Sequence, residues 1–373
     1  MISKNVSLHA DLRVFLIIIT TLILIGCLFV YSSSSVYALE TFNNPLFFVK
    51  RQLCGLCVAI IALCIGRTVS LNIIKKTSTL FFLSSLFLIG LTLLPSMSRN
   101  IHGSSRWLTF FKFSFQPSEI VKIALILYVA RFLEKKSLKK TISFFQRLFF
   151  TLLVGTMCIL LLKQPDFGMT ITLLLTTILL FFVSYASIKH IFLTLLTLAT
   201  SAFFLIILRP YRLQRLLTFL DPWQDPKGSG FQIIQSLIAI GSGNWLGTGI
   251  AHSRQKFFYL PMQHTDFIFS IIAEETGFIG SLFVVILFGL FLYFGIRIAQ
   301  QIQDAFGSLT IMGFVMLITL QAIMNIAVVT GLAPTKGVGL PFISYGNTAL
   351  VCSFFMIGII INIVHENRVY DYK

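Results

Sequence analysis

The chain has 373 residues, of which 56% are hydrophobic and only 11% are charged, and its formal net charge at pH 7 is +16. A mean hydropathy of +0.90 excludes an ordinary water-soluble domain, in which about a quarter of the residues are charged. The composition predicts a polytopic membrane protein.

Ten apolar stretches are long enough to cross the hydrocarbon core of a bilayer, which takes about 20 residues of helix. They lie near 14–33, 47–66, 77–95, 117–134, 147–163, 167–186, 189–208, 266–296, 308–330 and 345–364. We therefore expect an all-α fold of about ten transmembrane helices, in a single membrane domain covering residues 1–373. The first stretch lacks a small-residue cleavage site, so we interpret it as a retained anchor.

Basic residues in the loops predict how the chain is oriented. Arg67, Lys75, Lys76, Lys135, Lys136, Lys139 and Lys140 fall in alternate loops. Such loops are cytoplasmic by the positive-inside rule. An even number of spans then places both termini in the cytoplasm, so we expect a multi-pass protein of the cytoplasmic (inner) membrane.

The opposite face also carries basic residues, contrary to that rule. They are Arg99, Arg106 and Lys112 in the loop 96–114, and Arg209, Arg212, Arg215, Lys227, Arg254 and Lys256 in the segment 209–265. Topology gains nothing from these charges, so an outward basic surface predicts a polyanionic ligand such as a phosphate or pyrophosphate. Contact with anionic lipid headgroups is the alternative for any one of them.

The segment 106–122 combines polar side chains with the start of a span. Pro117 suits the first position of a helix, and Glu119 and Lys122 are then three residues apart on one face. They can pair with each other or hold a polar ligand at membrane depth. Arg106 and Trp107, just before the span, have the donor fork and amphipathic ring that suit a lipid headgroup.

The outer segment 209–265 is too long for an ordinary connection, which indicates a functional role. Arg212 and Arg215 lie three residues apart near its start. Further on, residues 231–243 have apolar side chains at helical spacing. This pattern predicts a short helix that lies at the membrane interface or re-enters the membrane.

Three carboxylates at the start of the span 266–296 are costly to place. A charge in hydrocarbon costs about 3 kcal/mol on insertion scales, so an acid there usually faces a polar cavity. With a helix beginning near Thr265, Asp266 lies in the first turn, where the helix dipole favours its ionised form. Helix stabilisation alone is the alternative for Asp266. For Glu274 and Glu275 we expect structural pairing with Arg or Lys from another span.

The last irregular segment, 331–347, reads GLAPTKGVGLPFISYGN. Its glycines and prolines forbid a regular helix, and irregular backbone beside a membrane is tolerated only where protein or a wet cavity covers it. Lys336, Ser344 and Tyr345 are its polar contributions.

The order and the residue sequences of these motifs resemble those of the SEDS (shape, elongation, division and sporulation) family of bacterial cell-wall polymerases, whose members include FtsW and RodA. The similar text is RW (106–107), QPSEIVK (116–122), QPDFG (164–168), FLDPWQDPKGSGFQIIQSLIAIGSG (219–243), LP (260–261), HTDFIFSIIAEETGFIG (264–280) and PTKGVGLPFISYG (334–346). The resemblance covers nearly the whole chain. PTKG before LPFISYG is similar to the FtsW, cell-division branch.

The resemblance implies an outward-facing peptidoglycan glycosyltransferase that polymerises lipid II, the undecaprenyl-pyrophosphoryl disaccharide-pentapeptide. The 4-hydroxyl of the acceptor sugar attacks the anomeric carbon of the growing chain and expels the lipid pyrophosphate, which needs a base and cations. The alternative function is a flippase that moves lipid II across the membrane, which also needs a polar cavity but no general base.

The resemblance also assigns roles to single residues. Asp266 matches the essential acid and is the candidate general base. Arg106, Glu119 and Lys122 match polar residues of the central cavity, with Arg106 and Lys122 assigned to pyrophosphate or sugar; Arg212 and Arg215 are weaker candidates, and Lys336 and Ser344 shape the site. A divalent cation, Mg²⁺ or Mn²⁺, is implied to bridge the pyrophosphate, although the sequence indicates no ligand set.

The implied partners are a class B penicillin-binding protein, which is a transpeptidase that crosslinks the new glycan, and other division proteins. Two positions depart from the family pattern. Met262 stands where the family usually has Glu, and Asn347 stands where it usually has Gly. We expect Asn347 to keep the loop shape by adopting a left-handed conformation. We also expect that neither change removes the base Asp266.

Overall fold

The computed structural model describes residues 2–94, 98–101, 104–110, 113–137, 143–184, 217–228, 230–256, 261 and 263–370. The predicted span 189–208, both predicted arginines of the outer segment, Arg212 and Arg215, and Met262 lie outside these described residues.

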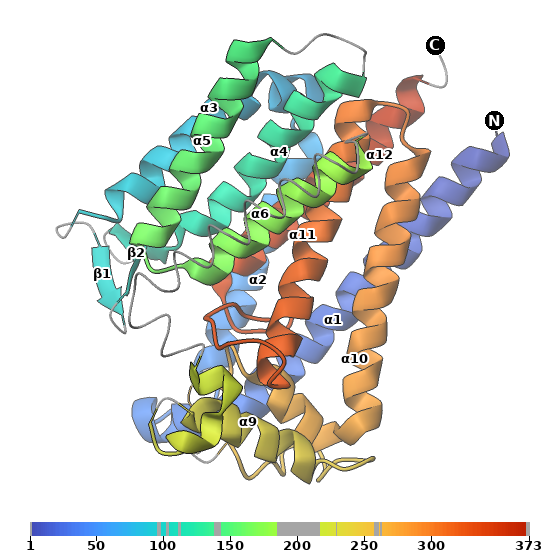
Figure 1. The fold of residues 1–373 in the computed structure, drawn as a ribbon. Coiled ribbons are helices and arrows are strands. Elements are labelled where there is room, and N and C mark those ends of the chain that lie inside the picture. The colour runs from blue at the N-terminus through green and yellow to red at the C-terminus, as the bar shows by residue number, and fades with distance from the viewer. Residues whose placement is uncertain are drawn as a thin grey trace.

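The described chain is a bundle of long helices with a small sheet and a short helix at one end (Figure 1). The helices are α1 (Ile2–Phe42), α2 (Phe47–Thr68), α3 (Leu71–Leu91), α4 (Pro117–Ser137), α5 (Phe144–Lys163), α6 (Phe167–Val183), α9 (Phe231–Ser242), α10 (Ile268–Gln301), α11 (Ala305–Val329) and α12 (Asn347–Tyr370), with a single 3₁₀ turn at Pro222–Gln224.

Nine of the ten predicted spans coincide with one of these helices. Seven helices are long and apolar enough to cross a membrane. The other two are α4, which carries several charged side chains, and α6, which is apolar but has only 17 residues. A bundle of membrane-spanning helices is therefore confirmed.

Both ends of the chain lie at the same end of the bundle (Figure 1). Ion pairs fasten this terminal end: Arg297 at the end of α10 lies 3.3 Å from Asp11 of α1, and Lys75 of α3 pairs with Glu134 of α4. The carboxylate of Glu366 accepts a hydrogen bond of 3.1 Å from the backbone amide of Leu71.

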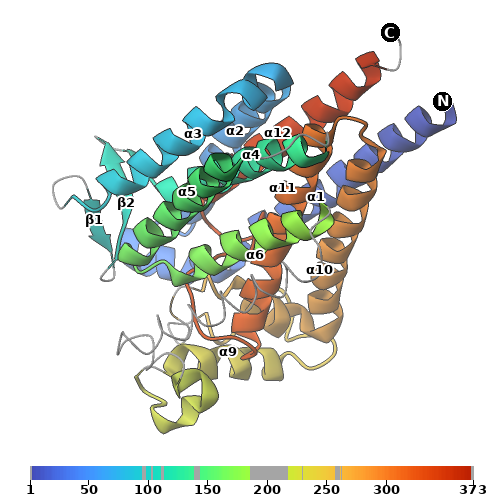
Figure 2. The same cartoon turned by 45° about the horizontal axis from the view of Figure 1, so that its top comes forward.

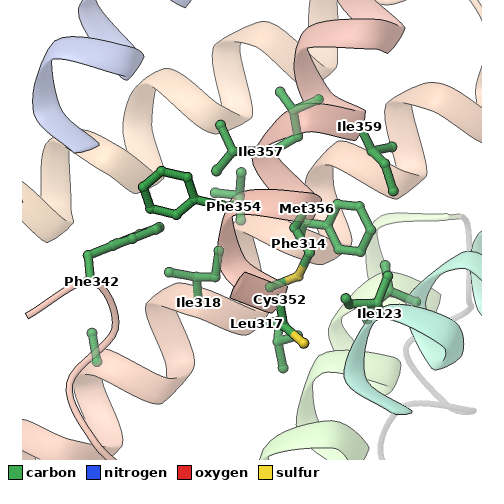
Figure 3. Close-up of a cluster of buried hydrophobic side chains, with 14 of the residues drawn as sticks. Ile123, Phe314, Leu317, Ile318, Phe342, Cys352, Phe354, Met356, Ile357 and Ile359 are labelled. Atoms are coloured by element: carbon green, nitrogen blue, oxygen red, sulfur yellow. The ribbon is translucent and has the colours of Figure 1, made fainter. Parts of the chain in front are cut away.

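The core of the bundle is built around α11, which contacts α4, α6, α10 and α12 (Figure 2). Apolar side chains of α4, α11 and α12 meet there, among them Ile123, Phe314 and Met356 (Figure 3). Helices α2 and α12 approach closely at glycines, as membrane helices often do. A methyl group in place of the Gly358 hydrogen would lie 2.3 Å from the carbonyl oxygen of Leu63.

A three-stranded antiparallel sheet at the end opposite the termini was not predicted. Its strands β1 (Ser98–Ile101), β2 (Ser104–Phe110) and β3 (Phe113–Phe115) are neighbours in that order. Arg99 pairs with Trp107 between β1 and β2, and Leu108 pairs with Phe115 between β2 and β3. Because alternate residues of a strand share a face, Arg106 lies on the same face of β2 as the buried Leu108.

The second irregular region at this end of the bundle is the segment that precedes α10. Helix α9 falls within the residues where the sequence predicts a short helix. It lies across the base of the bundle and contacts α10 and α11 (Figure 1). Helix α10 is not continuous, since Gly277 has φ 67° and ψ −162° inside it.

Candidate functional site

Asp266 lies in a turn immediately before α10, and not in the first helical turn as predicted, because α10 begins at Ile268. Three contacts fix this turn. The side-chain amide of Asn325 donates 2.7 Å to the carbonyl oxygen of Asp266. Ser344 donates 2.5 Å to the carbonyl oxygen of Thr265, and the amide of Tyr345 donates 3.0 Å to that of His264.

The Asp266 carboxylate and the Arg106 guanidinium face the same point beside Gly337. A methyl group in place of the Gly337 hydrogen would lie 3.4 Å from Oδ2 of Asp266 and 3.5 Å from Nη1 of Arg106. Gly337 is exposed, so this point is open to a ligand. Arg106 is held by Nη2, which donates 2.6 Å to the carbonyl oxygen of Pro165.

A second carboxylate, Asp166, lies on the other side of Arg106. Its Oδ2 is 3.8 Å from Nε of Arg106, and its Oδ1 accepts from the amide of Met169 at the start of α6. Lys336 packs against Gly168, where a methyl group would lie 2.7 Å from its Cδ. Two basic and two acidic side chains from four segments therefore gather at the end of the bundle opposite the termini.

Loss of water shifts the pKa values of two of these groups toward neutrality. Burial raises the pKa of Asp266 to about 6, with the positive charge of Arg106 lowering it and the negative charge of Asp166 raising it. Burial lowers the pKa of Lys336 to about 8, against a smaller opposite effect of Asp166. At neutral pH Asp266 is thus a carboxylate that accepts a proton readily, and Lys336 is a cation.

The predicted pair Glu119 and Lys122 lies deeper in the bundle and is connected to Asp266 through α11. The two side chains are buried and form an ion pair. Lys122 also donates 3.4 Å to the side-chain oxygen of Gln321. Gln321 and Asn325 share a face of α11 one turn, or about 6 Å, apart, and Asn325 contacts the Asp266 turn.

His264, two residues before Asp266, is enclosed by aromatic rings. Its ring centroid lies 4.4 Å from that of Phe48, 6.0 Å from that of Tyr37 and 5.7 Å from that of Tyr345. Burial lowers the pKa of His264 to about 4. The imidazole is therefore neutral at physiological pH, and it packs as an aromatic side chain.

Asn347 and Ser344 of the last irregular segment make contacts that the sequence did not predict. Asn347 is not in a left-handed conformation: it is the first residue of α12, and its side chain fills the space that Gly55 of α2 leaves open. Ser344 lies near the site, but its hydroxyl is engaged with backbone, since it also accepts 2.6 Å from the amide of Leu340.

The predicted pairing of Glu274 and Glu275 with basic residues of another span is wrong. Glu275 lies 3.4 Å from Lys256, which belongs to the outer segment. Glu274 accepts hydrogen bonds from that same segment, including 2.7 Å from the amide of Arg254. These carboxylates lack contact with any other span's basic side chain within the described part of the chain.

The described residues include no group of three or more His, Cys, Asp or Glu side chains that could hold a metal ion. Asp166 and Asp266 are each opposed by a basic side chain. These residues alone do not make a cation site of the kind that Mg²⁺ prefers, so the expected divalent cation stays a prediction.

Sequence reasoning missed Asp166, Gln321 and Asn325 as members of the site. Asp166 lies in the QPDFG motif, which carried the family resemblance, and that position was the available signal. Gln321 and Asn325 are polar side chains four residues apart in an apolar span, a spacing that places both on one helix face.

The family model described as cell cycle protein, which covers FtsW, RodA and SpoVE, matches residues 12–369. The chain belongs to this family. It is 42% identical over 358 residues to stage V sporulation protein E of Bacillus subtilis (strain 168), covering 95% of this chain and 97% of the relative. It is 39% identical over 345 residues to the probable peptidoglycan glycosyltransferase FtsW of Geobacter sp. (strain M18), covering 92% and 94%.

Solved structures share the fold. One, from work on structural coordination of polymerization and crosslinking by a peptidoglycan synthase complex, has a TM-score of 0.78 at 27% identity and covers 95% of this chain and 97% of its own. The rod shape determining protein RodA of Thermus thermophilus has a TM-score of 0.70 at 23% identity, covering 95% and 96%. The fold predicted from the sequence is therefore that of known family members.

Proposed function

We propose that this chain is a peptidoglycan glycosyltransferase that polymerises lipid II on the outer face of the cytoplasmic membrane. The observation that carries the proposal is the convergence of the Asp266 carboxylate and the Arg106 guanidinium on one open point beside Gly337. The names of the relatives, FtsW glycosyltransferases among them, support it.

Asp266 serves as the general base in this reaction. The acceptor 4-hydroxyl oxygen forms a bond to the anomeric carbon of the growing chain, and its proton passes to the Asp266 carboxylate. The bond between that carbon and the lipid pyrophosphate breaks, and the pyrophosphate leaves with the electron pair. A carboxylate whose pKa is about 6 suits this transfer, because the best base has a pKa near the working pH.

The basic side chains receive the charge of the leaving group. Arg106 has a planar donor fork that matches phosphate oxygens, and Lys336 adds a second positive charge. Lys122, which pairs with Glu119 deeper in the bundle, is assigned in this proposal to sugar or pyrophosphate. The buried side-chain oxygens of Ser118, next to Glu119, and of Asn325, which contacts the Asp266 turn, lack hydrogen-bond partners among the described residues, so both retain unused hydrogen-bonding capacity.

The outer location of the site follows from charge. The terminal end carries the loops that the positive-inside rule assigns to the cytoplasm, so the opposite end, with Arg106 and Asp266, faces outward. Both termini are then cytoplasmic. The wording of the PTKG segment favours the division branch, and thus a role in cell division.

The proposed partner is a class B penicillin-binding protein, acting among other division proteins. Support comes from the solved synthase complex, which is described as coordinating polymerization and crosslinking and shares this fold. Purification of the chain with its cognate transpeptidase tests the assignment: co-elution in detergent supports it, and separate elution with no gain in glycan synthesis contradicts it.

The decisive test of the activity is polymerisation of lipid II by wild type and by Asp266→Asn, with the transpeptidase present. We expect wild type to make glycan, and the variant to lose about 10³-fold in rate while binding lipid II equally. Asp304→Asn is a matched control at the terminal end, since Asp304 caps α11 and Asn caps equally well.

Two results would contradict the proposal. Equal glycan synthesis by wild type and Asp266→Asn would remove the base from the mechanism. Movement of lipid II between the leaflets of a vesicle, with no glycan from any preparation, would replace the polymerase with the flippase.

A further inference from the structure

At the break in α10 at Gly277, backbone groups of the outer segment form the hydrogen bonds that a continuous helix would have formed within itself. A helix interrupted at one residue leaves carbonyls before the break and amides after it without partners. The amides of Thr248 and Gly249 donate 2.9 Å and 3.1 Å to the carbonyl oxygens of Glu274 and Glu275. Residues 244–249 thus bond the first half of α10 at its end.

The same residues bond the start of the second half. The amide of Phe278 donates 2.8 Å to the carbonyl oxygen of Asn244, and the amide of Ile279 donates 3.3 Å to that of Trp245. Gly277 allows this close approach, because a methyl group there would lie 2.4 Å from the amide nitrogen of Gly247. The two halves are therefore joined through the outer segment as well as through Gly277.

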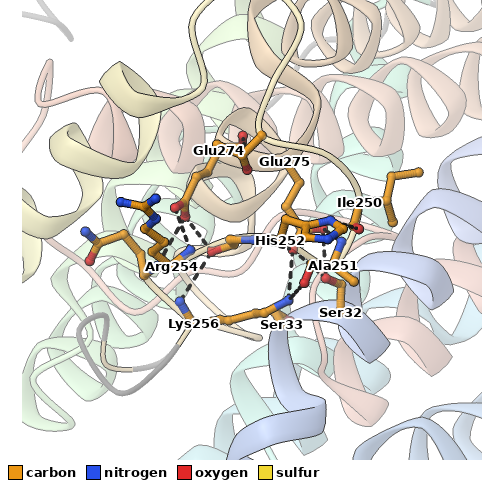
Figure 4. A network of polar contacts seen from close by, with 12 residues as sticks. Ser32, Ser33, Ile250, Ala251, His252, Arg254, Lys256, Glu274 and Glu275 are labelled. Atoms are coloured by element: carbon orange, nitrogen blue, oxygen red, sulfur yellow. Dashed lines mark hydrogen bonds and ion pairs between the residues drawn. The ribbon is translucent and has the colours of Figure 1, made fainter.

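The side chains of Glu274 and Glu275 hold the next part of the outer segment (Figure 4). Glu275 accepts 2.9 Å from the amide of Ala251 and lies 3.4 Å from Nζ of Lys256. Glu274 accepts 2.7 Å from the amide of Arg254, and also the hydroxyl of Ser253. We call the residues Ser253, Lys256, Glu274 and Glu275 the clamp. Glu274, Glu275 and Lys256 are all nearly free of solvent exposure.

Helix α1 attaches to the clamp through Ser32. The hydroxyl of Ser32 lies 2.6 Å from Oε1 and 2.8 Å from Oε2 of Glu275. One residue on, the carbonyl oxygen of Ser33 accepts 2.7 Å from the side-chain amide of Gln263. Gln263 and Glu275 bracket the stretch that includes Asp266, so two adjacent serines of α1 hold both ends of it.

From these contacts we propose that Glu275 and Ser32 are positioning residues, which fix the Asp266 turn by attaching both the half-helix behind it and the outer segment to α1. The proposal rests on the proposed function for its kinetic readout. Neither residue contacts the reacting atoms. Glu274 acts in the same way through Ser253 and the amide of Arg254.

Ser32→Ala is the first test, with Ser33→Ala as its matched control. Both changes remove one hydroxyl from adjacent buried positions. Only Ser32 donates to Glu275, whereas the hydroxyl of Ser33 donates to the carbonyl oxygen of Val30 in its own helix. The Ser33→Ala variant keeps the backbone carbonyl that accepts a hydrogen bond from the side chain of Gln263. We expect amide hydrogen exchange of residues 263–267 to become roughly tenfold faster in Ser32→Ala alone.

Glu275→Gln tests the charge, with Glu134→Gln as control. Both glutamates are buried and pair with a lysine, but Glu134 lies at the terminal end. In Glu275→Gln we expect kcat to fall with the KM for lipid II unchanged. We also expect the acid limb of the pH profile to move to lower pH, because a loosened turn lets water reach the Asp266 carboxylate, whose charged neighbours among the described residues are Arg106 and Asp166.

The exchange and the kinetics separate the two proposals. If wild type makes no glycan, the proposed function fails, and exchange at 263–267 still decides the positioning role. Equal exchange in Ser32→Ala and Ser33→Ala would overturn that role. A second result would also overturn it. In that result Glu275→Gln loses activity only in proportion to its loss of melting temperature, as Glu134→Gln does, and the acid limb of its pH profile stays where it is in wild type.

Discussion

Glu274 and Glu275 lie eight and nine residues after Asp266 in the chain, and the surroundings of their carboxylates are opposite to those of the Asp266 carboxylate. The two glutamate carboxylates accept hydrogen bonds from amides, hydroxyls and a lysine. The Asp266 carboxylate receives no hydrogen bond from the described residues and is balanced mainly by Arg106 at longer range.

The difference separates structural from chemical acids. A buried carboxylate that accepts several hydrogen bonds has its oxygen atoms engaged by the fold, and these hydrogen bonds compensate for the water that it has lost. A carboxylate deprived of water and of hydrogen bonds keeps a raised pKa and retains its capacity to take a proton. A carboxylate side chain thus holds the fold at Glu275 and is available for catalysis at Asp266, within one short segment.

Removal of the Arg106 side chain is expected to have the largest effect of the variants that follow. Arg106→Ala takes away the positive charge that lowers the pKa of Asp266, and loss of one such electrostatic group costs about 100-fold in rate. Arg106→Lys should recover part of it, since it keeps the charge but not the fork. Polymerisation assays with lipid II measure this. A rate within twofold of wild type for Arg106→Ala would contradict the assignment.

Glu275→Ala should affect stability where Asp266 variants do not. It leaves Lys256 buried without its partner, and breaking a buried ion pair costs about 3 kcal/mol. Glu134→Ala is the comparison, because the lysine that it leaves unpaired, Lys75, is 36% exposed and keeps its charge in contact with water. Thermal unfolding in detergent measures both. An equal drop in melting temperature for the two variants would erase the contrast.

Gly337→Ala should lower activity about tenfold without loss of stability. The added methyl group would occupy the point that Asp266 and Arg106 face, and small displacements of reacting groups are costly. Gly155→Ala, in a helix with open space around it, is the control and should be harmless or stabilising. Normal synthesis by Gly337→Ala would show that substrate binds elsewhere.

The pH profile should show the smallest but most specific effect. Because the raised pKa of Asp266 is about 6, the carboxylate forms as pH rises through that value, and synthesis rises with it. Because the lowered pKa of Lys336 is about 8, its charge is lost above that pH and synthesis falls. Lys336→Arg should remove the alkaline limb, since Arg stays charged. A limb unchanged in that variant belongs to another group.

The sequence predicted the spans because burial in lipid requires long apolar runs, and these are visible without any tertiary knowledge. It did not predict the sheet at 98–115, since strands of three to seven residues leave a weak pattern. It started the helix that follows about three residues too early, near Thr265 and not at Ile268, an ordinary uncertainty at a helix end.

The candidate site was only partly accessible from sequence. Asp266, Arg106 and Lys336 were predicted from their motifs, and the structure brings them together. The role of Asp166 depends on a contact across 60 residues with Arg106, which no local pattern encodes. The partners of Glu275 were missed because no sequence motif marks Ser32 or Ala251, and only the fold brings their hydrogen-bond donors to the Glu275 carboxylate.

The break at Gly277 has a consequence for the biogenesis of the protein. Helix α10 has 34 residues, of which the 24 after the break extend about 36 Å, while the hydrocarbon core measures about 30 Å. Residues 278–301 alone suffice to span it. The first half-helix carries two carboxylates, and its last carbonyls find their hydrogen-bond partners in Thr248 and Gly249; lipid could not supply such partners. We therefore expect residues 278–301 to insert as a span on their own, and the first half-helix to complete its folding only once residues 244–256 lie beside it.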